Sequence, residues 1–534
     1  MVLPLPRLLA HRLFWLWLYC ACLLLPSAVV SGDGLCKALY PLLFLLALSN
    51  HYRRFFWITL GFYLIAPVAL YYEIIYEVPP EASLWLILLG SSSVETADYL
   101  QHLNYYLVAA VVLPYFLLLP FFYGRLPDQP FATGRGWQLA GLLLLLVPGL
   151  RFFREKDSLD GYLSVYRHYK QSYPLNVMLG YPAAKIEISR VRALVDTQKK
   201  MLCSQNADVL EKPQTVVVVI GESARRDRLG VFGYERATTP EMSKRNDQLW
   251  LFDDVISSSF ETAGSVPTIL TGHLGDQGQL RPSFLQAFRS AGFETYWLSN
   301  QAQYGEYDSL VSAYAVAAEK KVFLHQHSYS VSLRTVYDEA LLPFLDEALR
   351  EKTTPKKLIV LHLYGSHADF SKRYPATFNY FPDSYDNSIR YTDHVLGSVI
   401  DRVAKVGGLS TVMYVADHGL NLGKCPGKSY HFNEKSNYEV PMMLWASPEW
   451  RAANPSLVGQ LSAAKKSLLT TEVVMPSLLT MAHVSCPAAA YERSLFASGK
   501  KAISPRRVKT LAGVMPYDTA HDDAECHMVA AGLH

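Results

Sequence analysis

The hydrophobic positions of the chain divide it into two unlike halves. Up to about Phe153 the sequence is dominated by long apolar stretches, whereas beyond about Thr215 it shows short apolar runs separated by longer mixed segments. The first pattern is typical of membrane-spanning helices and the second of buried strands alternating with helices. With 534 residues, too many for one ordinary core, the chain is predicted to contain a membrane-embedded half and a separate α/β domain.

Five apolar stretches are candidates to cross a membrane, since a helix needs about 20 residues to span the hydrocarbon core. They are Leu13–Val30, Cys36–Asn50, Phe55–Tyr76, Asn104–Tyr123 and Trp137–Phe153. The third and fourth are long enough, the first and fifth are marginal, and the second is short. We expect a five-helix transmembrane anchor. The alternative for the first stretch is a cleaved signal peptide, because Arg7 and Arg12 precede it and small residues end it.

The loop charges predict how this anchor is oriented. With the N-terminus in the cytoplasm, the inside carries Arg7, Arg12, Arg53, Arg54, Arg125 and Arg135. The opposite loops carry Asp33, Glu77, Glu81, Glu95 and Asp98, with Lys37 as the one basic exception. This is the positive-inside pattern, and five crossings then place everything after Phe153 outside the cytoplasm.

Three parts follow from these patterns: residues 1–153 as the transmembrane domain, 154–210 as a connection, and 211–534 as the external domain. Weak helical periodicity within Glu155–Lys200 is explained equally well by helices lying at the membrane surface and by a solvated linker.

The external domain is predicted to contain a largely parallel sheet covered by helices on both faces. The apolar runs expected to be its strands are Val216–Ile220, Thr295–Leu298, Leu358–Leu363, Val412–Val415 and Val440–Trp445. In such sheets, ligands bind beyond the carboxyl ends of the strands. Polar residues follow three of these runs: Glu222 after the first, His367 after the third, and the pair Asp417 and His418 after the fourth. Carboxylate and imidazole groups converging there indicate a site for a metal such as zinc.

The segment Ser257–Gly272, SSSFETAGSVPTILTG, offers a candidate nucleophile. Thr262 stands at the start of a predicted helix, where backbone N–H groups favour phosphate oxygens. A threonine hydroxyl becomes a competent nucleophile when a divalent cation helps to remove its proton. Spacing alone does not choose between Thr262, Ser265 and Thr268, which are equally ordinary residues for a helix start.

Composition excludes some other kinds of site. The net charge of +3 does not indicate a surface that binds nucleic acid. Seven cysteines are present, but Cys203, Cys425, Cys486 and Cys526 in the external part are far apart and form no CxxC pair. This argues against a cysteine zinc site and allows at most a few disulfides.

Several motifs, in this order, resemble those of the phosphoethanolamine transferases, the membrane branch of the alkaline phosphatase/sulfatase superfamily. They are GESARRDRLGVFGYERATTPEM, FETAGSVPTIL, HLYGSHADFSKRYP, YDNSIRYTD, VADHG and YHF. The resemblance covers nearly the whole chain, including the anchor. It implies that Glu222, Thr262, Asp417 and His418 hold one zinc ion, with Thr262 as the nucleophile.

The same resemblance assigns further residues to the substrate. It implies that His367 and His431 bind or protonate the phosphoryl group, with room for a second metal ion. Glu95, near Ser91, matches the external loop that contacts the lipid donor. Ser299, Asn300 and Gln301 stand where lipid A-modifying members carry a substrate-binding lysine, and Asn300 is our candidate among them.

Two further departures from the family pattern bear on the substrate. The usual DHGES reads DHGLN, so Leu420 replaces an acidic residue. The paired cysteines that flank the nucleophile loop in lipid A-modifying members are absent, and Ser258 and Thr268 lie nearby instead. These differences disfavour the lipid A branch and allow a sugar as acceptor.

The resemblance implies a two-step transfer of phosphoethanolamine from phosphatidylethanolamine to an envelope glycan or lipopolysaccharide, in the bacterial inner membrane with the catalytic domain in the periplasm. One alternative is a phosphoglycerol transferase that uses an anionic lipid. A sulfatase is disfavoured because the modification motif C/S-x-P-x-R is absent around Thr262. The alternative from another class is a non-catalytic membrane binding protein.

Overall fold

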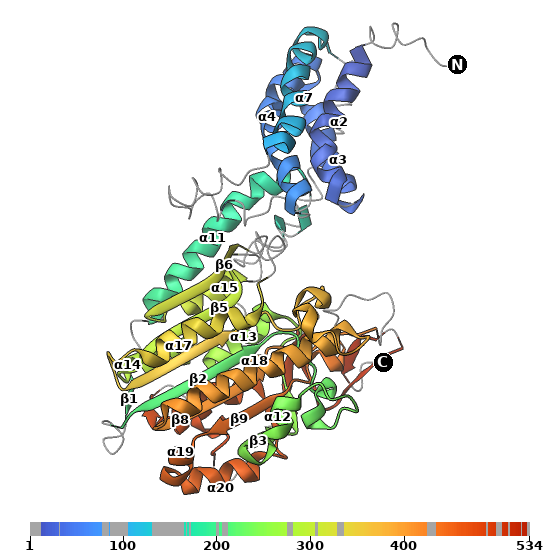
Figure 1. Ribbon diagram of the computed structural model, residues 1–534. Coiled ribbons are helices and arrows are strands. Elements are labelled where there is room, and N and C mark those ends of the chain that lie inside the picture. Colours follow the sequence, from blue (N-terminus) through green and yellow to red (C-terminus); the bar gives the residue numbers. More distant parts are fainter. Residues whose placement is uncertain are drawn as a thin grey trace. The chain divides into compact units, whose positions relative to one another are not determined.

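The computed structural model describes residues 12–30, 32–76, 85, 105–130, 165–166, 168–169, 172–198, 202–205, 212–274, 281–304, 308–327, 336–423, 434–487, 490–497, 505–510, 513–524 and 526–530. The chain forms two compact units, Met1–Ser189 and Arg190–His534 (Figure 1). The predicted three-part division at residues 153 and 210 is finer than these two units and stays a prediction.

The first unit is helical. Its helices are α2 (Arg12–Val30), α3 (Gly32–Ser49), α4 (Tyr52–Tyr76) and α7 (Tyr105–Arg125), and α11 (Leu175–Gln198) begins in this unit and runs past its end. Aromatic side chains pack between the helices: the rings of Tyr19 and Tyr63 stack with centroids 5.1 Å apart. The hydroxyl of Tyr63 donates to the carbonyl oxygen of Tyr115 at 2.9 Å, so α4 and α7 are joined by a buried polar contact as well.

Four of the five predicted apolar stretches are helical, but the described residues contain two helices, not five, that are long and apolar enough to cross a membrane. These are Tyr52–Ile74 and Tyr105–Arg125, whereas Arg12–Ala28 is a shorter apolar helix. The two that qualify are the stretches that the sequence already showed to be long enough, because a span needs about 20 apolar residues. The predicted stretch Trp137–Phe153 lies outside the described residues.

The second unit is built on a seven-stranded mixed sheet in the order β3-β9-β8-β2-β7-β5-β6 (Figure 1). Its strands are β2 (Gln214–Gly221), β3 (Leu249–Phe252), β5 (Glu294–Tyr304), β6 (Lys320–His327), β7 (Lys356–His362), β8 (Leu409–Ala416) and β9 (Met442–Ala446). Strands β8, β2, β7, β5 and β6 are mutually parallel, and β9 runs antiparallel to both β8 and β3.

All five predicted strands are present, and the expectation of a mostly parallel sheet is confirmed. Every residue of β2, β7 and β8 is buried. Since successive side chains of a strand point to opposite faces, this burial means that both faces of the central sheet are covered. The valine run Val216–Val219 lies at the middle of this core and is at most 2% exposed.

Helices and small strand pairs surround the sheet. The helices are α12 (Pro240–Lys244), α13 (Thr262–Thr271), α14 (Phe284–Ser290), α15 (Asp308–Ala315), α17 (Leu342–Arg350), α18 (Ser384–Val406), α19 (Pro448–Ala453), α20 (Pro455–Ala464) and α21 (Val474–Met481). Small pairs join β1 (Ser204–Gln205) to β11 (Val484–Ser485) and β4 (Asp254–Ile256) to β10 (Leu468–Thr470). Near the C-terminus, β12 (Arg507–Thr510) pairs with β13 (Gly513–Pro516), and β14 (Ala520–Asp522) with β15 (Met528–Ala530).

Candidate metal centre and nucleophile

The candidate site lies beyond the carboxyl ends of neighbouring central strands. Strand β2 lies between β7 and β8, and its last residue Gly221 is in register with Ala416 of β8. Glu222 and Asp417 therefore follow these strands side by side, and the amide of Asp417 donates to the carbonyl oxygen of Gly221 at 2.9 Å. Position 221 must be small, because a β-carbon there would lie 2.4 Å from the hydroxyl oxygen of Tyr414.

Glu222, Asp417 and His418 form a compact buried cluster. One ligand atom from each residue lies within 4.8 Å of the others, and among the described residues this is the group of three or more such side chains that could hold a metal ion. The Nε2 atom of His418 is 3.4 Å from Oε1 of Glu222 and 3.4 Å from Oδ2 of Asp417. All three side chains are at most 1% exposed.

Neighbouring groups orient the ligand atoms. Oδ1 of Asp417 accepts hydrogen bonds from the amides of Ser223 at 2.9 Å and His418 at 2.7 Å. Oδ2 of Asp417 is buried and lies 3.4 Å from Nε2 of His418, and among the described residues no hydrogen bond to it is formed. Nδ1 of His418 donates to the carbonyl oxygen of Gly419 at 2.8 Å. Because a carbonyl oxygen only accepts, this bond fixes the tautomer of a neutral ring that keeps a lone pair on Nε2.

The charges of the cluster call for a cation. Burial raises the pKa of Glu222 well above its usual value, and the neighbouring charge of Asp417 raises it further. Two buried carboxylates side by side are unfavourable unless a positive charge compensates them. Oδ2 of Asp417 and Nε2 of His418 supply the oxygen and imidazole donors that zinc prefers. The residues present therefore fit a zinc ion.

Thr262 brings a hydroxyl to this cluster. It is the first residue of α13, as the sequence predicted for a helix start, and α13 ends at Thr271, followed by Gly272 in a left-handed conformation. Its Oγ1 donates to Oε2 of Glu222 at 3.1 Å and lies 3.3 Å from Nε2 of His418. The hydroxyl of Ser265, in contrast, lies 3.4 Å from the carbonyl oxygen of Thr262. Of the three hydroxyls that spacing left open, the structure brings that of Thr262 to the candidate metal cluster.

The other predicted site residues lie in different places. His367 follows β7 and its ring stacks on Tyr364 with centroids 5.1 Å apart. Asn300 is fully buried, and its amide donates to Oδ1 of Asp338 at 2.8 Å. His431 and Glu95 lie outside the described residues. The roles assigned to these four residues stay predictions.

Two neighbours of the cluster were not among the predicted site residues. The side-chain amide of Gln301 donates to Oε2 of Glu222 at 3.0 Å and to the carbonyl oxygen of Leu363 at 3.0 Å. His362, the last residue of β7, is 2% exposed, and burial lowers its pKa to about 4, which keeps the ring neutral. His362 lies near the carboxyl end of the predicted strand Leu358–Leu363. Its position in the sequence could therefore have identified it as a neighbour of the site.

The departures from the family pattern are accommodated locally. Leu420 is fully buried, and its carbonyl oxygen accepts a hydrogen bond from Arg225 at 3.0 Å. The guanidinium of Arg225 also pairs with both carboxylate oxygens of Asp227, at 2.9 and 2.6 Å. Arg225 lies beside the segment Asp417–Leu420, which we call the metal-ligand turn because it carries two of the candidate ligands. Its ion-pair partner, Asp227, comes from its own part of the chain.

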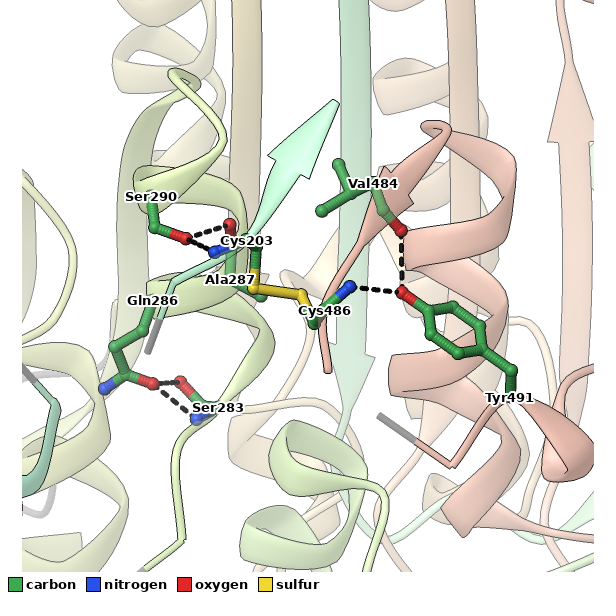
Figure 2. The surroundings of a disulfide bond; sticks show 8 residues. All are labelled: Cys203, Ser283, Gln286, Ala287, Ser290, Val484, Cys486 and Tyr491. Carbon is green, nitrogen blue, oxygen red and sulfur yellow. Dashed lines mark hydrogen bonds between the residues drawn. A yellow bond between two sulfur atoms is a disulfide. The ribbon is translucent and has the colours of Figure 1, made fainter. Parts of the chain in front are cut away.

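A disulfide links Cys203 to Cys486 (Figure 2), and the small strands β1 and β11 pair beside it. The hydroxyl of Tyr491 accepts from the amide of Cys486 at 2.9 Å and donates to the carbonyl oxygen of Val484 at 2.8 Å. None of the three clustered ligands is a cysteine.

We expect a variant with Cys203 and Cys486 both replaced by serine to keep its full metal content. Loss of this cross-link should lower the free energy of unfolding by about 2–5 kcal/mol. Metal analysis of the folded full-length variant, beside thermal unfolding, checks both statements. A folded variant without stoichiometric metal would show that the ligands had been chosen wrongly.

Known proteins resemble this chain in two ways, over about half of its length at higher identity and over a longer part at lower identity. The Sulfatase family model matches residues 214–484, half of the chain. YhbX of Escherichia coli K12 is 36% identical over 247 residues, covering 44% of this chain and 43% of YhbX. Phosphoethanolamine transferase OpgE of the same organism is 35% identical over 251 residues, covering 45% of this chain and 47% of OpgE. The chain thus spans less than half the length of these curated relatives.

A longer match at lower identity reaches beyond this region. Phosphoethanolamine transferase EptC of Escherichia coli K12 is 25% identical over 441 residues, covering 75% of each chain. The crystal structure of the C-terminal periplasmic domain of EptC in complex with Zn has a TM-score of 0.53 at 24% identity, covering 60% of this chain and 96% of that domain. This likeness shows a shared fold. The chain belongs to the sulfatase family, and its resemblance to the phosphoethanolamine transferases of that family is confirmed.

Proposed function

We propose that the chain is a zinc-dependent phosphoethanolamine transferase, which moves phosphoethanolamine from phosphatidylethanolamine to an envelope glycan or lipopolysaccharide. The observation that carries this proposal is the hydroxyl of Thr262, placed at a helix start within 3.3 Å of two buried metal-ligand side chains. The names of the relatives OpgE and EptC support phosphoethanolamine as the transferred group.

In the first step, Oγ1 of Thr262 attacks the phosphorus of the lipid donor. A bond forms between this oxygen and phosphorus, the bond from phosphorus to the glycerol oxygen breaks, and diacylglycerol leaves. Glu222, which accepts the hydroxyl hydrogen bond of Thr262, is placed to receive its proton. A zinc ion bound by Glu222, Asp417 and His418 would neutralise charge on the phosphoryl oxygens and lower the pKa of the threonine hydroxyl.

In the second step, a hydroxyl of the acceptor attacks phosphorus, and the bond between phosphorus and Oγ1 of Thr262 breaks. The acceptor oxygen loses its proton, and Thr262 recovers one. We assign to His367 and His431 the protonation of the leaving diacylglycerol oxygen in the first step, because both belong to motifs shared with the family. We assign donor or acceptor contacts to Asn300 and Glu95 on the same ground.

We further propose that the anchor crosses the inner membrane five times and leaves the catalytic domain in the periplasm. Two helices long and apolar enough to span a membrane support an anchor, and the basic residues of the predicted inner loops support its orientation. The Cys203–Cys486 disulfide supports an oxidising compartment, since such bonds are rare in the cytosol. An anchor on the same chain as the catalytic domain is physically sensible because the donor cannot leave the bilayer.

The half-reaction with lipid alone tests this proposal. We expect the full-length protein, supplied with zinc and with vesicles containing phosphatidylethanolamine but no acceptor, to release about one diacylglycerol per protein molecule. A burst of this size follows from a covalent intermediate that has nowhere to pass its group. Diacylglycerol is measured by mass spectrometry after rapid quenching.

Vesicles containing phosphatidylglycerol instead give the matched control. Release from these vesicles alone would replace the proposal by a phosphoglycerol transferase. Absence of release from either lipid, by a folded zinc-loaded protein, would favour a non-catalytic binding protein. Comparison of envelope glycans and lipids by mass spectrometry, with and without the protein in its host, identifies the acceptor.

A further inference from the structure

The four C-terminal strands lie beyond residues 214–484, which the Sulfatase family model covers. They form the two C-terminal strand pairs, β12 with β13 and β14 with β15. Their apolar side chains do not join the main core. They form a separate buried cluster with three residues of the site's surroundings: Ile256, Phe260 and Tyr438. Ile256 immediately precedes the nucleophile segment, Ser257–Gly272, and Phe260 belongs to it, so this cluster includes side chains that lead up to Thr262.

A backbone hydrogen bond joins the first strand pair to that segment. The amide of Lys509 in β12 donates to the carbonyl oxygen of Ser258 at 2.8 Å, and Ser259 forms a parallel bridge with the same residue. Only Phe260 separates Ser259 from Glu261, the residue that precedes helix α13. The position of the Thr262 hydroxyl therefore depends on a backbone that β12 holds.

A buried arginine fixes the same strand pair in place. The side chain of Arg506 is 4% exposed and pairs with Asp254 of β4 at 2.7 Å and with Asp518 at 2.8 Å. It also donates to the carbonyl oxygen of Leu469 in β10 at 3.1 Å. Strand β4 leads directly into the nucleophile segment, so Arg506 joins the beginning of this segment to the C-terminal strand pairs.

A second path of contacts leads from these strands to the metal-ligand turn. The hydroxyl of Tyr517 donates to Oε1 of Glu439 at 2.9 Å, and that of Tyr438 donates to the carbonyl oxygen of Lys509 at 3.1 Å. The neighbouring carbonyl oxygen of Asn437 accepts from the amide of Gly419 at 2.8 Å. Gly419 in turn accepts the hydrogen bond from Nδ1 of His418.

Both paths end on residues of the candidate site, one on Thr262 and the other on His418. If the C-terminal strand pairs only covered apolar surface, the buried cluster would be enough. The hydrogen bonds that they direct to the two segments of the candidate site would not be needed. We propose that the C-terminal strand pairs are a positioning element that holds the Thr262 hydroxyl against the metal-ligand turn. This proposal rests on the proposed function. Its positioning residues are Lys509, which acts through its backbone amide, and Tyr517.

Lys509→Pro tests the first path, with Lys509→Ala as the matched control. The amide of Lys509 points to Ser258, so it takes no part in the ladder with β13, and proline removes that one bond. Alanine keeps the amide. In full-length protein we expect Lys509→Pro to lower kcat for diacylglycerol release about 10- to 100-fold, with the donor KM changed less than about twofold. Misplacement of a reacting group by about 1 Å has effects of this size.

Zinc affinity, measured by competition with a chromogenic chelator, gives a readout that needs no transfer. We expect Lys509→Pro to weaken zinc binding about tenfold relative to Lys509→Ala, since a hydroxyl that contacts the ligands moves. If the unaltered protein releases no diacylglycerol, the proposed function fails, and this comparison still decides the positioning role. Equal kcat and equal zinc affinity in the two variants would overturn it.

Tyr517→Phe tests the second path without altering the backbone, and it decides the matter if Lys509→Pro does not fold. It deletes one hydroxyl that donates to Glu439. Tyr491→Phe deletes one hydroxyl beside the disulfide (Figure 2) and serves as its control. We expect a several-fold lower kcat and weaker zinc binding for Tyr517→Phe alone. The same small loss in both variants would mean that the strand pairs only add stability.

Discussion

Thr262→Ala is expected to lower the transfer rate by at least about 10³-fold, because the attacking oxygen itself is removed. The fold should be largely unchanged, since the side chain is partly exposed and only a small polar group is lost. Circular dichroism and thermal unfolding verify the fold. The rate is measured as release of diacylglycerol from phosphatidylethanolamine vesicles, with and without an envelope extract as acceptor.

Thr262→Ser is the matched control, and it should keep a measurable fraction of the rate because the attacking oxygen remains. The decisive observation is a peptide from unaltered protein incubated with donor lipid alone, carrying the mass of phosphoethanolamine on Thr262. The same mass on Ser223 or Ser265 would show that the nucleophile is another residue, although the reaction class survives. No trapped adduct, with inverted stereochemistry at phosphorus, would replace the two-step scheme by a direct transfer.

Asp417→Asn is expected to weaken zinc binding more than about 100-fold. Loss of a partner that merely orients a ligand already costs 10–100-fold, and this change removes a ligand charge. Diacylglycerol release should fall with the bound metal. The substitution is conservative in shape, because an asparagine oxygen can still accept the amides of Ser223 and His418 that Oδ1 now accepts.

Thermal unfolding gives a measure of this change that is independent of activity. A ligand that binds only the native state raises its stability, so chelation should lower the Tm of the unaltered protein. The Tm of Asp417→Asn should hardly respond to the chelator. The two carboxylates of the empty cluster repel each other, so the chelated variant should be at least as stable as the chelated unaltered protein. An equal response of both proteins to chelation would contradict this ligand set.

The sheet could be predicted because its central strands are buried on both faces and read as continuous apolar runs such as Val216–Ile220. The antiparallel direction of β9 could not, since an apolar run does not record which way a strand points. Strand β6 was not predicted, because it contains the polar residues Lys320, Lys321, His325 and His327 and does not read as an apolar run. Among the described strands, β6 lies at the edge of the sheet and pairs with β5 alone.

The ligand cluster could be predicted in part because a parallel sheet brings the residues after β2 and β8 together whatever the loops do. The choice of Thr262 over Ser265 could not be made from spacing, because it depends on the direction in which α13 begins. Gln301 was overlooked as an individual residue, although it adjoins Asn300. The register of strand β5 shifts between Ser299 and Ala302, and within this irregular stretch it is Gln301 that reaches Glu222.

The Cys203–Cys486 disulfide closes a covalent ring whose two ends are 283 residues apart in the sequence, and the ring contains Glu222, Thr262, Asp417 and His418. A single proteolytic cut anywhere inside this ring leaves one covalent molecule, which runs at its full mass on a gel without reductant. Under reduction it separates into two fragments. Gel mobility with and without reductant therefore reports, in crude membranes and without any activity measurement, whether the ring is closed.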